Sequence, residues 1–420
     1  MFTFLPGKYA SPRRSWEFID CSMPMTFDQY SNCGYNCLYC FSTFQRSIWW
    51  PKKDYLQKKV KMIDFEKIEK MFRDPDTYWW QFKEYIKWKY VLQRGGLSDP
   101  FCPIEEEWEV GLKLLKLFNE LKYPVRFSSK SDLLLRDKRY LNEFKKWKDY
   151  FAYMTSIITF DPEIAKKLEA GTPSPQRRME VLKVLSDIWV YTVLRLRPYI
   201  IWITDKTVKE MITEAGKSKV KAISTEFLCI DQRTTPLVKQ KFWKISELCW
   251  FDIFNFYKIH SNTVWYIRLS REFTRPYMDE LVHLCAKNNI KVAVSCPKHK
   301  EKTFWYSCCW LPTDWPLGNT HKGQYMYAIK IAQEKWMVHW SDIEKFNILW
   351  HIGRATAFWY NRGNWRLVWI NRDNSLKDEL HNLRNNPKKH NSPYRLFEWV
   401  LIPKGLDENW DVIYYYNPRA

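Results

Sequence analysis

Three cysteines near the start of the chain are the residues best suited to carry chemistry. Cys33, Cys37 and Cys40 lie in the segment NCGYNCLYCFS, with three residues between the first two and two between the last two. Thiolates at this spacing can bind three irons of a cubane iron–sulfur cluster from one short loop and leave the fourth iron open. The alternative is a zinc or structural site, but zinc needs a fourth protein ligand, and the nearest cysteine downstream is Cys102.

The sequence around these cysteines alternates between strand and helix patterns. The predicted strands span residues 26–33, 90–93, 124–129, 151–160, 191–197 and 220–230. The predicted helices between them span residues 64–89 (broken near 74–76), 104–121, 138–148, 162–169, 174–189 and 207–217. Such alternation indicates an α/β fold with a parallel sheet. We expect a partial (β/α)6 barrel of the TIM type, with functional residues at the C-terminal ends of its strands.

The same patterns predict how the chain is divided. Residues 1–25 are expected to form an N-terminal extension and residues 26–230 the barrel. Residues 231–320 flank the barrel; their first thirty positions look aromatic and irregular, and a helix at 276–289 and a strand at 290–295 add a last unit. Residues 321–420 are expected to form a basic, aromatic α+β appendage.

The charge of the chain favours a polyanionic partner. There are 67 Lys and Arg against 47 Asp and Glu, a net charge of +20, which nucleic acid explains best and an anionic surface second. Basic and aromatic residues interleave in segments 354–372 and 384–394, as in sites that bind phosphates and stack bases. The alternative is a lysine-rich solvated surface over a small aromatic core.

Hydropathy and the N-terminus predict a cytoplasmic protein. No run of 18 apolar residues occurs and mean hydropathy is -0.50, so we expect no membrane-spanning helix. The N-terminal residues lack the apolar stretch of a signal peptide. In the cytosol, eleven cysteines are more consistent with metal ligands, reactive thiols or core residues than with disulfides.

The cysteine spacing after the first strand resembles the radical S-adenosylmethionine (SAM) superfamily. Four further segments resemble its spore photoproduct lyase-like branch, and they span residues 96–107, 127–137, 156–178 and 194–198. The resemblance implies a [4Fe–4S] cluster on Cys33, Cys37 and Cys40 and SAM on the open iron. One electron from the cluster then splits SAM into a 5′-deoxyadenosyl radical, so the cofactors supply the difficult chemistry.

The resemblance also implies a SAM pocket. Its expected residues are Tyr39, Gly95, Gly96, Ser98 and Lys130, with Ser156 and Thr159 on the ribose or carboxylate and Arg178 and Arg195 on the carboxylate or an acidic substrate. Glycine lets a backbone approach a ligand closely, and an ammonium or hydroxyl suits a carboxylate. For each polar residue, the alternative is a helix cap or an ordinary contact at a strand end.

The sequence departs from the lyase pattern in two places. Gly96 stands where the lyases have the cysteine that donates a hydrogen atom, and Phe41 replaces one of two tyrosines beside the third cluster cysteine. The radical-return pathway of the lyase is therefore in doubt. Cys102, four residues after Ser98, is a candidate substitute donor.

A second cysteine group lies in SCPKHKEKTFWYSCCW. Cys296, Cys308 and Cys309, with His299 between them, can bind an auxiliary iron–sulfur cluster or zinc. Alternatively one thiol, such as Cys309, donates a hydrogen atom to a substrate radical. A third interpretation is an incidental pair, because adjacent cysteines cannot easily point at one metal without strain.

These observations predict a radical SAM enzyme that acts on a nucleic-acid base in repair or modification, supplied with electrons by a flavodoxin or ferredoxin. Two alternatives remain. One is modification of a peptide or small metabolite, with the Cys296 group as an auxiliary cluster. The other is a nucleic-acid-binding protein whose cluster is structural. The sequence does not predict an oligomeric state.

Overall fold

The computed structural model describes residues 3–5, 8–9, 11–14, 25–46, 59–77, 83–231, 235–261, 266–305, 311, 324–344, 358–360, 367–369, 376–389 and 392–419. Cys308 and Cys309 lie outside these residues, as does most of the basic segment 354–372.

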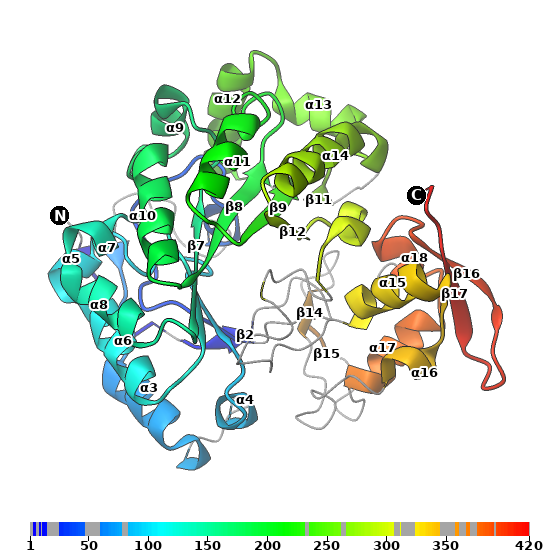
Figure 1. Ribbon diagram of the computed structural model, residues 1–420, viewed down its shortest axis with the longest axis horizontal. Coiled ribbons are helices and arrows are strands. Elements are labelled where there is room, and N and C mark those ends of the chain that lie inside the picture. The colour runs from blue at the N-terminus through cyan, green and yellow to red at the C-terminus, as the bar shows by residue number, and fades with distance from the viewer. Residues whose placement is uncertain are drawn as a thin grey trace.

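A largely parallel sheet forms the centre of the described chain (Figure 1). Its strands lie in the order β12–β9–β8–β7–β6–β5–β3–β2, and every neighbouring pair except β2–β3 is parallel. The strands are β2 (Arg13–Arg14), β3 (Met25–Phe27), β5 (Leu92–Arg94), β6 (Val125–Ser128), β7 (Phe151–Ser156), β8 (Tyr191–Tyr199), β9 (Ala222–Phe227) and β12 (Lys291–Val294). The predicted α/β partial barrel is confirmed, and the predicted last strand, β12, joins the same sheet.

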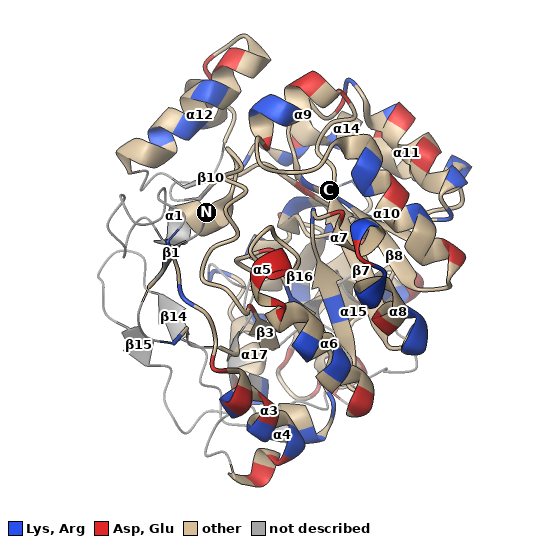
Figure 2. Ribbon diagram, turned by 90° about the vertical axis from the view of Figure 1, so that its left-hand side faces the viewer, with Lys and Arg blue, Asp and Glu red and all other residues tan. Residues whose placement is uncertain are grey.

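Helices connect these strands, as parallel pairing requires. They are α1 (Phe41–Arg46), α3 (Phe65–Arg73), α4 (Lys83–Lys87), α5 (Glu105–Trp108), α6 (Val110–Glu120), α7 (Leu133–Arg136), α8 (Lys138–Lys146), α9 (Pro162–Leu168), α10 (Pro175–Asp187), α11 (Val208–Lys217), α12 (Pro236–Cys249), α13 (Ile253–Ile259) and α14 (Arg271–Lys287). Short 3-10 turns are η1 (Pro75–Thr77) and η2 (Pro297–Lys302). Helices such as α8, α10 and α11 carry charges of both signs (Figure 2).

Local sequence signals explain where several helices begin. The hydroxyl of Ser174 accepts a hydrogen bond from the Arg177 amide at 3.2 Å, and Pro175 occupies the first turn of α10. The Asp161 carboxylate caps α9 in the same way, accepting from the Glu163 amide at 2.8 Å. Such caps satisfy amides that the helix leaves unpaired.

Two predictions about local structure are corrected. Residues 231–260 are not irregular, because they contain α12 and α13; Pro236 stands in the first turn of α12 and Asp252 caps α13. The first strand ends at Phe27 and does not continue to Cys33. Beyond it the chain leaves the sheet, and Tyr30 forms an isolated bridge with Met62.

The C-terminal part is a small α+β unit beside the barrel (Figure 1). A three-stranded antiparallel sheet has the order β13–β17–β16. Its elements are α15 (Gln324–Lys335), β13 (Met337–Val338), α16 (Trp340–Glu344), α17 (Leu376–Arg384), α18 (Pro393–Leu396), β16 (Leu401–Leu406) and β17 (Val412–Tyr416). A buried ion pair between Lys298 and Glu398, 2.9 Å long, ties this unit to the barrel flank.

Three minor strand pairs complete the described structure: β1 (Thr3–Phe4) with β4 (Lys59–Val60), β10 (Ile230–Asp231) with β11 (Tyr266–Ile267), and β14 (Phe358–Tyr360) with β15 (Leu367–Trp369). In the described residues, no helix combines the length and the apolar character needed to cross a membrane.

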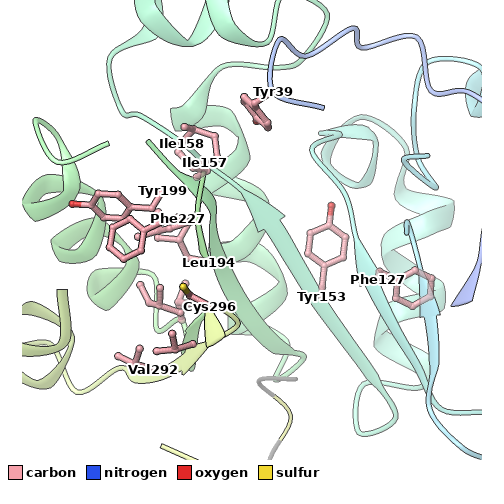
Figure 3. Packing of buried hydrophobic residues seen from close by; sticks show 14 of the residues in the cluster. Tyr39, Phe127, Tyr153, Ile157, Ile158, Leu194, Tyr199, Phe227, Val292 and Cys296 are labelled. Atoms are coloured by element: carbon pink, nitrogen blue, oxygen red, sulfur yellow. The ribbon is translucent and has the colours of Figure 1, made fainter. Parts of the chain in front are cut away.

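Alternation along the strands separates two faces of the main sheet. Phe127, Tyr153 and Leu194 belong to the large hydrophobic core, and Figure 3 shows them projecting from neighbouring strands. Burying each such side chain contributes about 1.5–3 kcal/mol. Because successive side chains point to opposite faces, Ser128 and Arg195 lie on the other face. We call this the inner face. Its hydrophobic side chains form a second, smaller cluster that is separate from the main core.

Candidate functional site

The three cysteines lie in the loop between β3 and α1, at the C-terminal edge of the parallel sheet. Gly34 and Asn36 have positive φ values of 70° and 50°, which let this short loop turn back on itself. Cys37 is buried, while Cys33 and Cys40 are partly exposed. The structure therefore confirms that the three cysteines follow the first strand, as the sequence predicts.

Asp28, at the start of this loop, fixes it to the end of β5. Its carboxylate accepts hydrogen bonds from the amides of Leu97 at 3.1 Å and Ser98 at 3.3 Å. The Ser98 hydroxyl donates to the Tyr30 carbonyl at 2.6 Å. The residue expected to contact SAM therefore also joins two strand ends, and its oxygen keeps lone pairs that can accept.

Asp99 extends this connection to the end of β6. Its carboxylate accepts from the Ser129 hydroxyl at 2.7 Å and from the Lys130 amide at 2.6 Å. Burial raises the pKa of Asp99, although these hydrogen bonds act in the opposite direction. Two carboxylates thus join the ends of three neighbouring strands around the cysteine loop.

The thiols of the loop sit in contrasting electrostatic environments. Burial raises the pKa of Cys37 to about 12, against the attraction of Lys130. Burial also raises the pKa of Cys33. Burial acts in the same direction on Cys40, but the Lys241 ammonium and hydrogen bonds from Thr43 outweigh it and lower the pKa of Cys40.

Glu169 organises a buried charged group behind the loop. Its carboxylate pairs with the fully buried Arg178 guanidinium at 2.6 Å and accepts a hydrogen bond from the Tyr39 hydroxyl. The Lys130 ammonium lies 4.0 Å from the same carboxylate and 5.6 Å from the centre of the Tyr39 ring. Burial alone would lower the pKa of Lys130, but Cys37 and Glu169 raise it.

Three of the expected pocket residues meet in this group: Tyr39, Lys130 and Arg178. Arg178 also donates to the Ser156 carbonyl at 2.5 Å. Because Ser156 ends β7 and Glu169 follows α9, the contacts of Arg178 connect these two elements. Thr159 lies further along, 3.3 Å from the Thr207 hydroxyl, where it also accepts from the Asp161 amide. For Thr159, these are the contacts of a loop and helix cap.

Gly95 allows the ends of β5 and β6 to approach closely. Its φ is +81°. A Cβ atom at this position would lie closer to the Ser128 carbonyl oxygen than 3.0 Å, a distance below which real Cβ atoms are essentially never found. The backbone of the protein itself therefore requires glycine at this position. Gly96, the next residue, is partly exposed in the same turn.

Arg195 lies at the centre of the inner face. It occupies the same register level as Ser156 on β7 and Ser224 on β9, and its guanidinium donates to the Ser128 hydroxyl at 2.9 Å. Two residues further along β8, Arg197 pairs with Glu226 at 2.5 Å. Cationic side chains therefore point from β8 onto the inner face at successive levels.

The remaining candidate cysteines are in apolar surroundings or outside the described chain. Cys102 is completely buried in the main core, and burial holds its pKa well above the usual range. Cys296 is also buried, close to Val292 in Figure 3. His299 is buried too and contacts the Thr274 hydroxyl at 2.8 Å. Because Cys308 and Cys309 are not described, the auxiliary site stays a prediction.

The donor set fits an iron–sulfur cluster. Within the described ranges, no three His, Cys, Asp or Glu side chains converge as they would on one metal ion. A cubane does not need such convergence, because each cysteine binds a different iron. Two lysines from distant elements, Lys130 and Lys241, act on the thiols, which suits a group whose ligands are thiolates.

Sequence reasoning missed Asp28, Glu169 and Lys241. Asp28 and Glu169 carried a weak signal, since each stands beside a segment already singled out, the first before the cysteine loop and the second within residues 156–178. Lys241 carried none, because it lies in the stretch expected to be irregular.

We compared this chain with known proteins. No family model matches the chain. Among curated proteins, the uncharacterized protein MJ0683 of Methanocaldococcus jannaschii is 25% identical over 173 residues, 41% of this chain. The match covers 59% of that relative, less than two thirds of its length.

Solved structures give a wider match. A substituted spore photoproduct lyase with bound AdoMet and dinucleoside spore photoproduct has a TM-score of 0.50 and 13% identity, over 67% of this chain and 79% of that one. Spore photoproduct lyase complexed with dinucleoside spore photoproduct has a TM-score of 0.50 and 12% identity, over 67% and 78%. In fold, this chain therefore resembles spore photoproduct lyase over about two thirds of its length.

Proposed function

We propose that this chain is a radical SAM enzyme that acts on a nucleic-acid base. The observation that carries the proposal is the cysteine loop, which presents Cys33, Cys37 and Cys40 at the C-terminal edge of a parallel sheet. When bound there, a [4Fe–4S] cluster with SAM supplies the electron and the 5′-deoxyadenosyl radical that removes a hydrogen atom.

The residues of the chain have separate tasks in this proposal. Asp28 and Asp99 hold the strand ends in place, and the turn at Gly95 and Gly96 would let the backbone approach bound SAM. The Lys130 side chain is 20% exposed, and its ammonium is suited to the SAM carboxylate. Ser98 and Ser156 offer hydroxyls at neighbouring strand ends.

The inner face supports an anionic substrate. Arg195 and Arg197 lie on the same sheet, Arg197 paired with Glu226, and guanidinium groups bind phosphate in a forked geometry. The net charge of +20 also favours a polyanion. A base within a duplex would need to be extruded before radical chemistry could reach it. A single-stranded or flipped nucleotide is therefore the expected substrate.

The activity proposed is repair or modification in general, because the lyase reaction lacks its usual hydrogen donor. Gly96 and Phe41 carry no thiol or hydroxyl, and Cys102 is fully buried. A flavodoxin or ferredoxin is the proposed electron source.

Anaerobic reconstitution tests the cofactor. We expect about four irons per chain for one cluster and about eight if an auxiliary cluster forms. Reduced, reconstituted protein should convert SAM to 5′-deoxyadenosine, and the triple variant of Cys33, Cys37 and Cys40 to alanine should not. A cluster that forms without 5′-deoxyadenosine release would favour a binding protein with a structural cluster.

Isotope transfer tests the substrate. Deuterium from labelled single-stranded DNA or RNA should appear in 5′-deoxyadenosine, and labelled peptides should give none. Binding of the oligonucleotide should weaken with salt, and Arg195→Ala should weaken it more than Arg177→Ala, a matched change on the outer helix α10. Transfer from peptide alone would overturn the choice of nucleic acid.

A further inference from the structure

We propose that Lys241 is a positioning residue that holds the cysteine loop and raises the reduction potential of its cluster. The inference rests on the proposed function, because it concerns the same cysteine site. It assigns a role to α12, a helix outside the predicted barrel of residues 26–230.

The contacts of Lys241 are long-range and specific. Its ammonium donates to the Cys37 carbonyl at 3.0 Å and to the Thr43 hydroxyl at 3.3 Å, across 204 and 198 residues of sequence. The side chain is only 4% exposed. Burying an ammonium is costly unless partners compensate it, so the site must offer favourable charge as well as two hydrogen bonds.

With a cluster bound, the thiolates of the loop would supply that charge. Within the described chain, no carboxylate forms an ion pair with Lys241. Burial lowers the pKa of Lys241, and Cys40, Cys37 and Cys33, in that order, oppose this shift. Lys130 differs, because its charge is shared with Glu169 at 4.0 Å. Lys241 is thus a buried ammonium that contacts the cysteine loop and has no ion-paired carboxylate among the described residues.

This placement has a consequence for electron transfer. Adding an electron to a thiolate-bound cluster increases its negative charge, and a nearby buried cation stabilises the reduced form more than the oxidised form. Charge and hydrogen bonding around a cluster set its potential. Lys241 should therefore make reduction by a flavodoxin or ferredoxin easier.

The test is a redox titration of the reconstituted protein, followed by electron paramagnetic resonance. Lys241→Met removes the charge but keeps most of the stem, Lys241→Gln keeps a donor without the charge, and Lys241→Arg keeps the charge. Lys239→Met, an exposed change on the same helix, is the matched control. Iron content and circular dichroism identify the variants that fold and hold the cluster.

We expect the Met and Gln variants to have more negative midpoint potentials than the wild type, and the Arg and Lys239 variants to stay close to it. A wild-type potential in either uncharged variant at full iron content overturns the inference. If neither uncharged variant holds iron while Lys241→Arg does, the loop-holding role stands and the effect on potential is rejected. Wild-type protein that binds no cluster would instead reject the proposed function.

A second, independent observation concerns the backbone. Among the described residues, six of the thirteen non-glycine residues with positive φ are tryptophans, and three glycines, Gly34, Gly95 and Gly405, also have positive φ. The tryptophans are Trp189 (70°), Trp202 (72°), Trp250 (66°), Trp336 (68°), Trp399 (68°) and Trp410 (63°). Left-handed backbone is a genuine outlier for a bulky residue and routine only for glycine.

Three of these positions are ones that glycine usually takes. Trp250 is the C-terminal cap of α12, and Trp336 directly follows α15, where helices commonly end on glycine. Trp410 lies in the turn between β16 and β17, where its amide donates to the Asp407 carbonyl at 3.0 Å, and the longer hairpin turns commonly place a residue in the left-handed region. Trp250 and Trp410 are 89% and 79% exposed, so their rings gain little from burial.

We infer that glycine stands at these six positions in the protein as its own cell makes it. Genetic codes differ in whether the codon UGA is read as stop, tryptophan or glycine, and such a codon would produce this pattern. The chain has 24 Trp but only 12 Gly, a balance that the same cause explains.

Peptide mass spectrometry of protein from cells that naturally carry the gene tests the inference. Each affected peptide should be lighter by the difference between a tryptophan and a glycine residue, and tryptophan in these peptides overturns the inference. In recombinant protein, Trp250→Gly and Trp410→Gly should raise the midpoint of thermal unfolding, whereas Trp340→Gly, a buried helical control, should lower it. A lower midpoint for both turn variants would contradict the backbone argument.

Discussion

Replacing Arg178 with methionine tests whether the buried group around Glu169 holds the site together. The Arg178 guanidinium is 0% exposed and lies 2.6 Å from the Glu169 carboxylate, itself 1% exposed. Removing one partner of a buried pair costs about 3–5 kcal/mol, because the other charge is left uncompensated. For a domain of 150–250 residues, each kcal/mol lowers the midpoint of unfolding by about 2–4 °C. The expected loss is therefore about 6–20 °C.

The neighbouring residue provides the control. Arg177 is 37% exposed and pairs with Glu180 at 2.7 Å and with Asp132 at 3.2 Å, and a surface pair contributes about 0–1 kcal/mol. Arg177→Met should therefore lower the midpoint less than Arg178→Met does, by at most about 8 °C. Thermal unfolding followed by circular dichroism measures both.

The effect should reach the cysteine loop through Tyr39, whose hydroxyl donates to Glu169. Reconstituted Arg178→Met should retain less iron than Arg177→Met. Combining Arg178→Met with Glu169→Gln should cost less than the sum of the two single changes, because the partners interact directly. Equal midpoints for the Arg177 and Arg178 variants would refute the reasoning.

Two further predictions concern backbone geometry and protonation. Gly95→Ala should lower the free energy of unfolding more than Gly405→Ala does. Both positions have positive φ, but only at Gly95 would a Cβ atom meet another backbone atom. Urea unfolding of Gly405→Ala should therefore show a loss of only about 1–2 kcal/mol. Equal losses would contradict this. Burial lowers the pKa of His299 from 6.5 to about 3. Between these two pH values the unfolded chain therefore binds more protons at this histidine than the folded chain does. The contribution of His299 to stability, complete above pH 6.5, should fall by up to about 1.4 kcal/mol per pH unit as the pH drops towards 3. The difference in unfolding free energy between wild type and His299→Leu should change between pH 7 and pH 5, and a constant difference would show that His299 does not titrate as expected.

The amino-acid sequence by itself determined the parts of this protein that depend on local geometry. The alternation of strands and helices, the start of α10 at Ser174 and Pro175, and the cysteine loop after the first strand all follow from spacing and capping along the chain. These features are short-range, so residue order alone specifies them.

Tertiary structure decided which polar groups face one another. Arg178, a candidate partner of the SAM carboxylate or an acidic substrate, pairs with Glu169 in the structure, and Lys241 reaches the loop across 204 residues. The first contact depends on how α9 and α10 pack behind the cysteine loop, and the second on where α12 docks. Buried charges select partners from whatever the fold brings within hydrogen-bonding distance, and sequence spacing does not encode that distance.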